Sequence, residues 1–361
     1  MRENLENPFP LPLWLNKCFA AQSASVLYRA VVALRNKAYD KFAFLSHPPS
    51  RPTISIGGIR AGGTGKTPVA HFCGEYLSSR GYDIAFLSRG YGRRSKDQLL
   101  ISPSETVSWE SVGDEPSLLK KNLPQSWIAA GSNRVQSAKE LSGRVSKDTV
   151  FILDDGFQHR RLRRNLDIIC VHEHVLSDFM IPHGYLREPL SSLFRADFLI
   201  LTAGISDSVE RLTEVAKKLR NRYKKPVSIL IQKPEYWVNG TSGETSAVLP
   251  LKEPIVVCGI ARPHRFINLI RSMDIRPSEI LSFKDHHIFQ MNDFLGMRNL
   301  YSKGLVTTEK DFLRLSSIDS AKLPQTWYLK IKLDFADNES QTAFYSTMDK
   351  FNHKITQKEA L

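Results

Sequence analysis

A short glycine-rich segment constrains this chain more than any other feature of its sequence. Residues 62–67 follow an apolar run that predicts a strand, Thr53–Ile56, and precede a helix predicted to begin at Pro68. Glycines let a backbone wrap around phosphate groups, and the positive end of a helix dipole lies beside such a loop. The segment therefore predicts a nucleoside triphosphate site on a strand–loop–helix unit. It reads Gly62-Gly63-Thr64-Gly65-Lys66-Thr67.

The entrance to this loop departs from both common forms of phosphate loop. The usual pattern has glycine five positions before Gly65, where this chain has Arg60. A deviant form found in dimeric ATPases and GTPases carries lysine just before the paired glycines, where this chain has Ala61. The phosphate-facing part is intact, so Lys66 is expected on the β- and γ-phosphates and Thr67 on Mg²⁺.

Short apolar runs alternate with helical stretches from Pro52 onward. Several of these runs are continuous, as expected for strands that are covered on both faces. Right-handed βαβ units follow from this alternation. We expect an α/β fold, a doubly wound and mostly parallel sheet like that of P-loop NTPases, with a second, smaller α/β domain. The strands predicted in the first domain are 53–56, 83–87, 127–130, 149–153, 167–171, 197–201 and 227–231.

Changes in composition predict the domain boundaries. Residues 1–45 form an N-terminal segment and 46–232 the nucleotide-binding domain. A polar stretch over 233–250, with the turn signal Asn239-Gly240, predicts a linker or a hairpin. A second β/α series predicts a smaller domain over 251–361 that closes the active-site cleft, with a frayed end from about residue 353.

The net charge, the cysteine positions and the lack of long apolar runs limit which classes of protein this chain can belong to. The 361-residue chain has a formal net charge of +13, which favours anionic partners. Its four cysteines are far apart, so a disulfide framework or a zinc site is not expected. The sequence contains no apolar run long enough for an ordinary transmembrane helix.

The N-terminal segment mixes apolar, aromatic and basic residues. Trp14 and Phe19 precede the mostly apolar stretch 24–34, and cations such as Arg29 and Lys37 are interleaved or flanking. This mixture suits an amphipathic helix lying in a membrane interface. A helix packed on the core of the protein itself explains the same pattern, and these residues alone do not separate the two.

An acidic pair follows one of the predicted strands. The apolar run 149–153 continues directly into Asp154 and Asp155. In many nucleotide sites a carboxylate at this position holds Mg²⁺ beside the loop threonine. The alternative is an ordinary acidic turn, but the neighbouring phosphate loop favours a metal site.

Three further polar clusters lie near predicted strand ends, where doubly wound sheets bind their ligands. Asp114 and the cluster 285–287 together offer a carboxylate and an imidazole, a reasonable base unit for a hydroxyl proton. Sequence spacing does not show that they meet. The clusters are Ser88-Arg89-Gly90-Tyr91-Gly92, Gly113-Asp114-Glu115-Pro116 and Asp285-His286-His287.

Taken in order, these motifs resemble the tetraacyldisaccharide 4'-kinase family, the lipid A 4'-kinases of Gram-negative bacteria. The resemblance runs from the N-terminal segment to about residue 315. It implies an ATP- and Mg²⁺-dependent kinase for the 4'-hydroxyl of a tetraacylated disaccharide 1-phosphate, a peripheral enzyme on the cytoplasmic face of the inner membrane. The matching segments are 62–68, 88–92, 113–116, 154–159, 186–190, 285–287 and 307–311.

The resemblance also implies roles for particular residues. Asp114 falls on the catalytic base, with its partner histidine at His286 or His287 and His286 preferred. Lys66, Asp155 and Arg187 complete the catalytic set. The cofactor-binding residues are the six of the loop, 62–67. The implied metal ligands are Thr67, Asp154 and Glu188, and the implied substrate-binding residues are Arg89, Tyr91, Arg134 and His159.

Two rival functions use the same phosphate loop. A P-loop GTPase or ATPase switch, or a metal-insertion chaperone, is disfavoured by the scattered cysteines and by Ala61. A nucleic-acid-binding ATPase would account for the charge, but helicase-like motifs are not found. The expected partners are an anionic membrane surface and the lipid disaccharide 1-phosphate, with no nucleic acid and no protein partner.

Overall fold

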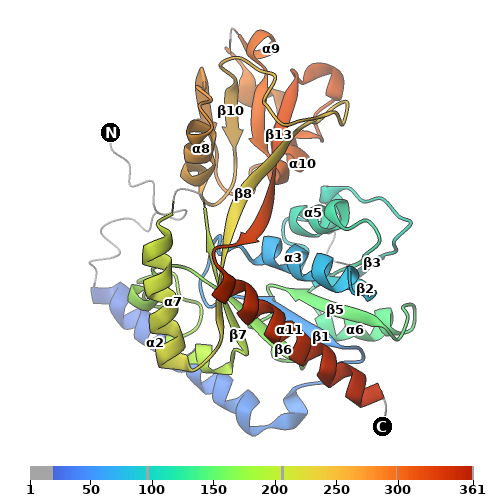
Figure 1. Cartoon of the computed structure of the whole chain (residues 1–361), viewed down its shortest axis with the longest axis vertical. Helices are drawn as coiled ribbons and strands as arrows, with labels where there is room; N and C mark the ends of the chain where they lie inside the picture. The colour runs from blue at the N-terminus through green and yellow to red at the C-terminus, as the bar shows by residue number, and fades with distance from the viewer. Residues whose placement is uncertain (1–18, 95–96, 205–206, 298, 360–361) are drawn as a thin grey trace. The chain divides into compact units, whose positions relative to one another are not determined.

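A computed structural model describes residues 19–94, 97–204, 207–297 and 299–359 (Figure 1). The chain divides into two compact units, which are described in turn. The larger unit comprises Pro10–Ala203, Ser208–Ile231 and Phe335–Leu361, and the smaller one includes Gly204–Asp207 and Gln232–Asp334.

A doubly wound sheet forms the centre of the larger unit. Its strand order is β8-β7-β6-β1-β5-β2-β4-β3, and every pairing is parallel except that of β3 with β4. The predicted mostly parallel α/β fold is therefore confirmed. The strands are β1 (Thr53–Gly57), β2 (Asp83–Ser88), β3 (Leu99–Ile101), β4 (Trp127–Ala130), β5 (Thr149–Asp154), β6 (Leu166–Val171), β7 (Phe198–Ala203) and the start of β8 (Val227–Asn239).

Helices cover both faces of this sheet, which explains why its central strands are apolar throughout. On one face, β6 and β7 pack against α7 and part of α2, and β2, β4 and β5 pack against α6. On the other face, Phe344 of α11 contacts Phe72 of α3 and Phe198 of β7. The helices of this unit are α2 (Phe19–Lys41), α3 (Lys66–Ser78), α4 (Trp109–Val112), α5 (Asp114–Asn122), α6 (Arg134–Ser142), α7 (Val209–Tyr223) and α11 (Asn338–Glu359).

Helix α2 packs on the larger unit through one face only. Ala21 and Val32 are buried, and Tyr28 packs against the core beside them. The opposite face exposes an apolar row that includes Leu27 and Leu34. Packing on the core is thus observed, whereas interfacial binding stays a prediction. Within the described ranges, the structure contains no helix with the length and apolar character needed to cross a bilayer.

The smaller unit is built on its own parallel strands, in the order β11-β10-β12-β13. The polar stretch after Gln232 forms a hairpin, because β8 turns at its end and pairs antiparallel with β9. Its elements are β9 (Thr245–Ser246), β10 (Ile255–Cys258), α8 (Pro263–Ser272), β11 (Glu279–Ser282), α9 (Leu300–Lys303), β12 (Leu305–Thr308), α10 (Glu309–Leu315) and β13 (Thr326–Phe335).

The C-terminal helix α11 belongs to the larger unit, which differs from the predicted boundary of 251–361. Phe344, Met348, Phe351 and Ile355 recur at helical spacing and are all buried. This stripe anchors the helix, so residues from 353 to Glu359 remain helical where fraying was expected.

Candidate active site

The glycine-rich segment connects β1 to α3, the strand–loop–helix order that the sequence predicts. Gly65 adopts a φ of 74° at the position that precedes α3. A Cβ atom at Gly65 would lie 2.7 Å from the Thr202 hydroxyl, so both conformation and space require glycine here. The Thr202 hydroxyl also donates a hydrogen bond to the carbonyl of Thr64 at 3.1 Å. Strand β7 therefore supports the loop from beneath.

The acidic pair at the end of β5 lies directly beside the loop. The Thr67 hydroxyl donates a hydrogen bond to Asp154 Oδ2 at 3.2 Å. Lys66 Nζ lies 3.8 Å from Asp155 Oδ1. The arrangement follows from the register of β1 and β5, because the carboxyl ends of adjacent parallel strands meet at one edge of the sheet.

The two carboxyl groups differ in their electrostatic environment. Burial, together with Glu115 and Asp155, raises the pKa of Asp154 to about 7. Burial also disfavours ionisation of Asp155, but Lys66 and Arg187 outweigh it and hold the pKa of that carboxyl well below its ordinary value. Asp155 is therefore a fixed anion, while Asp154 needs a further cation to be fully ionised at neutral pH.

Arg187 completes this constellation. Its guanidinium donates to both oxygens of Asp155, at 2.8 and 2.7 Å, and to the carbonyl of Gly58 at 3.1 Å. The bidentate geometry fixes the plane of the guanidinium beside the loop.

Glu188 is placed differently from its predicted role as a metal ligand. Its carboxylate is fully buried and accepts hydrogen bonds from Asn36, Gln158 and Arg195. Both oxygens are thus committed to protein donors, so we assign Glu188 a structural role.

Arg60, the residue that replaces glycine, is part of the scaffold of the loop. Its Nε donates to Asp178 Oδ2 at 2.7 Å, and its guanidinium lies over the ring of Tyr185. Backbone hydrogen bonds join the same segments, from Ala61 to the Tyr185 carbonyl and from Arg187 to the Ile59 carbonyl. The segment that carries Arg187 is therefore attached to the entrance of the phosphate loop.

Two of the predicted polar clusters pack against each other. Gly113 has a φ of 97°, and a Cβ atom there would lie 2.7 Å from the carbonyl oxygen of Tyr91. This close approach sets the first residue of α5, the buried Asp114, beside the loop that follows β2. Arg89 and Tyr91 of that loop are both exposed.

Arg134 and His159 are embedded among charged groups of the larger unit. Burial lowers the pKa of Arg134 to about 10, against the opposing effect of Asp155 and Asp154. Burial and neighbouring arginines lower the pKa of His159 to about 4, so its imidazole is neutral at pH 7. Both residues lie on the larger unit with the acidic pair, and their role in substrate binding stays a prediction.

The histidine pair belongs to the smaller unit. His287 stacks on Phe283, with ring centroids 4.4 Å apart, and its Nε2 lies 2.9 Å from Asp293. His286 adopts a φ of 61° and bonds through its backbone N–H to the Gly259 carbonyl. These contacts give His287 a packing role. The predicted pairing of Asp114 with His286 joins the two units and stays a prediction.

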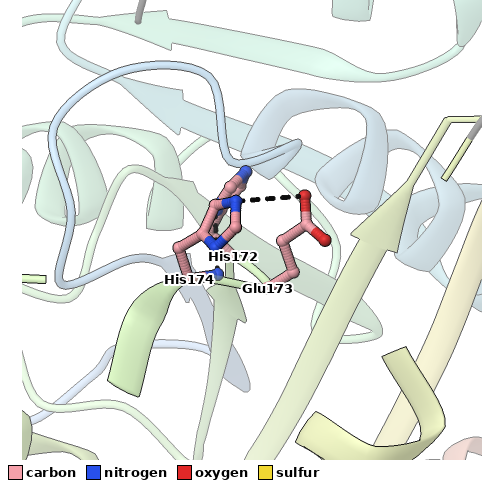
Figure 2. A group of neighbouring side chains, drawn as sticks. All are labelled: His172, Glu173 and His174. Atoms are coloured by element: carbon pink, nitrogen blue, oxygen red, sulfur yellow. Dashed lines mark hydrogen bonds and ion pairs between the residues drawn. The ribbon is translucent and has the colours of Figure 1, made fainter. Parts of the chain in front are cut away.

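A further polar cluster follows β6 and is shown in Figure 2. His172, Glu173 and His174 lie within reach of one cation. The Arg211 guanidinium, however, lies 2.9 Å from His174 Nδ1 and 3.4 Å from Glu173, and His172 Nδ1 accepts from the backbone N–H of His174. The Arg211 guanidinium already occupies the position of a cation beside Glu173 and His174, so we assign no metal to this cluster.

Several residues that build the site were not identified from the sequence. Thr202 and Gln158 bond to the backbone of the loop region, and Glu115 acts electrostatically on Asp154. Gln158 and Glu115 lie within recognised motifs, so their position was the available signal. Thr202 ends a strand with no motif of its own.

Comparison with known proteins identifies the family. The family model for LpxK, tetraacyldisaccharide-1-P 4'-kinase, matches residues 19–349. A tetraacyldisaccharide 4'-kinase of Chlorobaculum parvum is 32% identical over 343 residues, covering 90% of this chain and 92% of the relative. One from Aquifex aeolicus is 32% identical over 299 residues, covering 82% of this chain and 89% of the relative. The chain belongs to the tetraacyldisaccharide 4'-kinase family.

A solved structure agrees with this assignment. LpxK from Aquifex aeolicus, described in complex with ATP, matches with a TM-score of 0.72 at 28% identity, over 91% of this chain and 98% of that one. The protein is thus an ATP-dependent tetraacyldisaccharide 4'-kinase, a transferase of lipid A biosynthesis. The switch and chaperone alternatives are not supported.

Proposed function

We propose that this kinase transfers the γ-phosphoryl group of ATP to the 4'-hydroxyl of a tetraacylated disaccharide 1-phosphate at the Lys66–Asp155–Arg187 constellation. The observation that carries the proposal is the ion-pair chain from Lys66 through Asp155 to Arg187 beside the phosphate loop. Two cations held by one ionised carboxylate are preorganised for the charge that develops on a transferred phosphoryl group.

Thr67 and Asp154 fit a magnesium ion. Asp154 Oδ1 is buried and has no hydrogen-bond partner among the described residues, while Oδ2 is held by the Thr67 hydroxyl. Oxygen ligands of this kind suit Mg²⁺, and the bound ion would neutralise β- and γ-phosphate oxygens. We expect Asp154→Asn to remove most of the Mg²⁺-dependent part of ATP affinity and to keep metal-free binding, as measured by calorimetry with and without Mg²⁺. An unchanged Mg²⁺ dependence would exclude Asp154 as a ligand.

Asp114 is the proposed base. It accepts the proton of the 4'-hydroxyl as the sugar oxygen bonds to the γ-phosphorus and the bond to the β-phosphate oxygen breaks, which releases ADP. Its position as the first residue of α5, tied to the Glu115 N–H at 2.9 Å, fixes the direction of the carboxylate. Lys66 and Arg187 stabilise the transferred group, and His286 is the proposed partner of Asp114.

The exposed face of α2 is proposed to bind an anionic membrane surface, on the cytoplasmic side of the inner membrane. Leu27 and Leu34 are 68% and 72% exposed, and Phe44 beyond the helix is 78% exposed. Exposed cations, Arg29 and Lys37, lie on the same helix. Apolar side chains bordered by cations are typical of a helix lying at the interface of an anionic bilayer.

A direct assay tests the proposed reaction. Purified enzyme, γ-labelled ATP and Mg²⁺ are expected to label a tetraacylated disaccharide 1-phosphate in mixed micelles. A disaccharide acceptor without acyl chains serves as the matched control. Equal turnover of the deacylated acceptor would reject the lipid as the substrate class. Loss of labelling in Lys66→Ala, with the fold retained, would link the reaction to this loop.

A further inference from the structure

Glu188 is a buried side chain at a junction of three segments. It is 0% exposed, and its oxygens accept from Asn36 at 2.9 Å, from Gln158 at 3.2 Å and from Arg195. A buried carboxyl group has lost its contact with water and depends on protein hydrogen-bond donors, so each of these contacts matters to its position. The neighbouring residue in the chain is Arg187.

Helix α2 contacts this junction at two points. Asn36 donates its side-chain N–H to Glu188 Oε2, and the Tyr28 hydroxyl donates to the backbone carbonyl of Arg187 at 3.2 Å. Both residues lie on the face of α2 that packs on the larger unit. Residues 28 and 36 are two helical turns apart, so one helix contacts two consecutive residues of the active-site segment, the backbone of Arg187 and the side chain of Glu188.

The same junction reaches the phosphate loop. Gln158 donates from one amide nitrogen to Glu188 Oε1 and to the Gly58 carbonyl, at 3.2 and 2.9 Å. The Gly58 carbonyl also accepts from Arg187. Glu188 therefore orients Gln158, and both Gln158 and Arg187 converge on the backbone that enters the loop.

We infer that Asn36 is a positioning residue for phosphoryl transfer, acting through the buried Glu188 on the peptide that carries Arg187. The inference rests on the proposed role of Arg187 at the transferred phosphate. Among the described residues, the side chain of Asn36 bonds to Glu188 and not to the phosphate loop. Asn36 supplies one of the hydrogen-bond donors that the buried Glu188 carboxylate needs. By holding Glu188 in place, it also fixes the direction from which the neighbouring Arg187 reaches Asp155. Helix α2 then supports the catalytic site from behind through Tyr28 and Asn36, and it also presents an exposed apolar face.

Steady-state kinetics of Asn36→Leu, a substitution of similar size without the donor, test the inference. We expect kcat to fall about tenfold with KM for ATP nearly unchanged, because Arg187 is displaced where charge develops in the transition state. Asn221→Leu, the same change at an exposed position of α7, is the matched control. If Asn36→Leu does not fold, Tyr28→Phe serves in its place. That variant deletes a single hydroxyl and is expected to lower kcat by about threefold.

A charge exchange separates positioning from general stability. Asn36→Asp sets a second carboxylate against Glu188 and is expected to lower kcat about a hundredfold, whereas Asn36→Asp with Glu188→Gln restores a donor–acceptor pair and recovers at least tenfold of that loss. A double variant that regains kcat without a matching gain in thermal midpoint supports a positioning role for Asn36. The inference is overturned if the folded Asn36→Leu variant keeps the parental kcat, or if only its KM for ATP rises. Parental kcat in Arg187→Ala instead overturns the proposed role of Arg187.

Discussion

Arg60 is buried beside the phosphate loop, where it pairs with Asp178 and lies over the ring of Tyr185. Both charged side chains are only 9% exposed. Removing one partner of a buried pair leaves the other charge uncompensated and costs about 3–5 kcal/mol. We therefore expect Arg60→Ala to lower the thermal midpoint by about 5 °C, as measured by circular dichroism.

The matched control for this change is Arg144→Ala, at an exposed arginine of the same unit, which is expected to leave the midpoint unchanged. An Arg60→Ala enzyme as stable as the parent would contradict the role of the pair. The usual glycine at this position has no side chain, whereas the side chain of Arg60 holds the neighbouring segment through Asp178 and Tyr185.

His159 gives the larger unit a defined dependence on pH. Its folded pKa is about 4, below the ordinary value of 6.5, because of burial and four arginines. The unfolded chain therefore binds more protons between pH 6.5 and 4, and stability falls as the pH falls through that range. The arginines are Arg134, Arg164, Arg161 and Arg35.

We expect a shift from pH 7 to pH 5 to remove about 2 kcal/mol of stability through this histidine. The drop in thermal midpoint between those pH values should be smaller in His159→Gln than in the parent. His353→Gln, at an exposed histidine of α11, should keep the full drop. Equal drops in all three proteins would show that His159 is accessible to protons in the folded state.

At the scale of single residues, the sequence points to the groups proposed to face the phosphates but not to most of the groups packed behind them. Lys66, Thr67 and Asp154 lie in local motifs whose chemistry requires those residue types. Asn36 and Glu188 are more than 150 positions apart, and their contact depends on how α2 docks. A carboxylate in a motif looks the same in sequence whether it binds a metal or a buried amide, so the sequence does not reveal the protein donors that surround Glu188.

At the scale of elements, α2 combines two faces with different tasks. One face is bound to the larger unit through Ser25, Tyr28 and Asn36. The other exposes leucines that the fold does not use. Because Leu27 and Leu34 are largely exposed already, replacing both by aspartate should leave the fold intact and remove the apolar contact with a bilayer.

Burying a leucine contributes about 1.5–3 kcal/mol, so the Leu27→Asp/Leu34→Asp variant should bind anionic vesicles at least about a hundredfold more weakly. Co-sedimentation with phosphatidylglycerol vesicles measures this. Val248→Asp, at a valine that is 75% exposed on the smaller unit, is the control and should bind as the parent does. Equal binding by both variants would mean that α2 is not the membrane contact.

At the scale of the whole molecule, hydrophobic pattern predicted the doubly wound sheet, because its central strands are buried on both faces and read as continuous apolar runs. The same reasoning failed for α11. Its buried residues, such as Phe344 and Phe351, are separated by polar ones, and the helix returns to the larger unit after more than a hundred intervening residues. Local sequence pattern predicts the helices and strands. It does not predict which unit a terminal helix packs against, because that depends on long-range contacts in the folded chain.

The proposed base unit makes a quantitative prediction about the two units together. Asp114 lies on the larger unit and His286 on the smaller one. If they act as a pair in the reaction, removing either disables the same proton transfer, and the losses are not additive. We expect Asp114→Ala to lower kcat by about a thousandfold and His286→Ala by about a hundredfold, with the double variant no slower than Asp114→Ala alone.

Single-turnover kinetics with saturating ATP measure this cycle without interference from product release. His287→Ala is the internal control, because the His287 ring is stacked on Phe283 and bonded to Asp293. That variant should lose thermal stability and keep most of its kcat. Multiplicative losses in Asp114→Ala/His286→Ala would instead mean that the two residues act in separate steps, and the base would then be assigned to the larger unit alone.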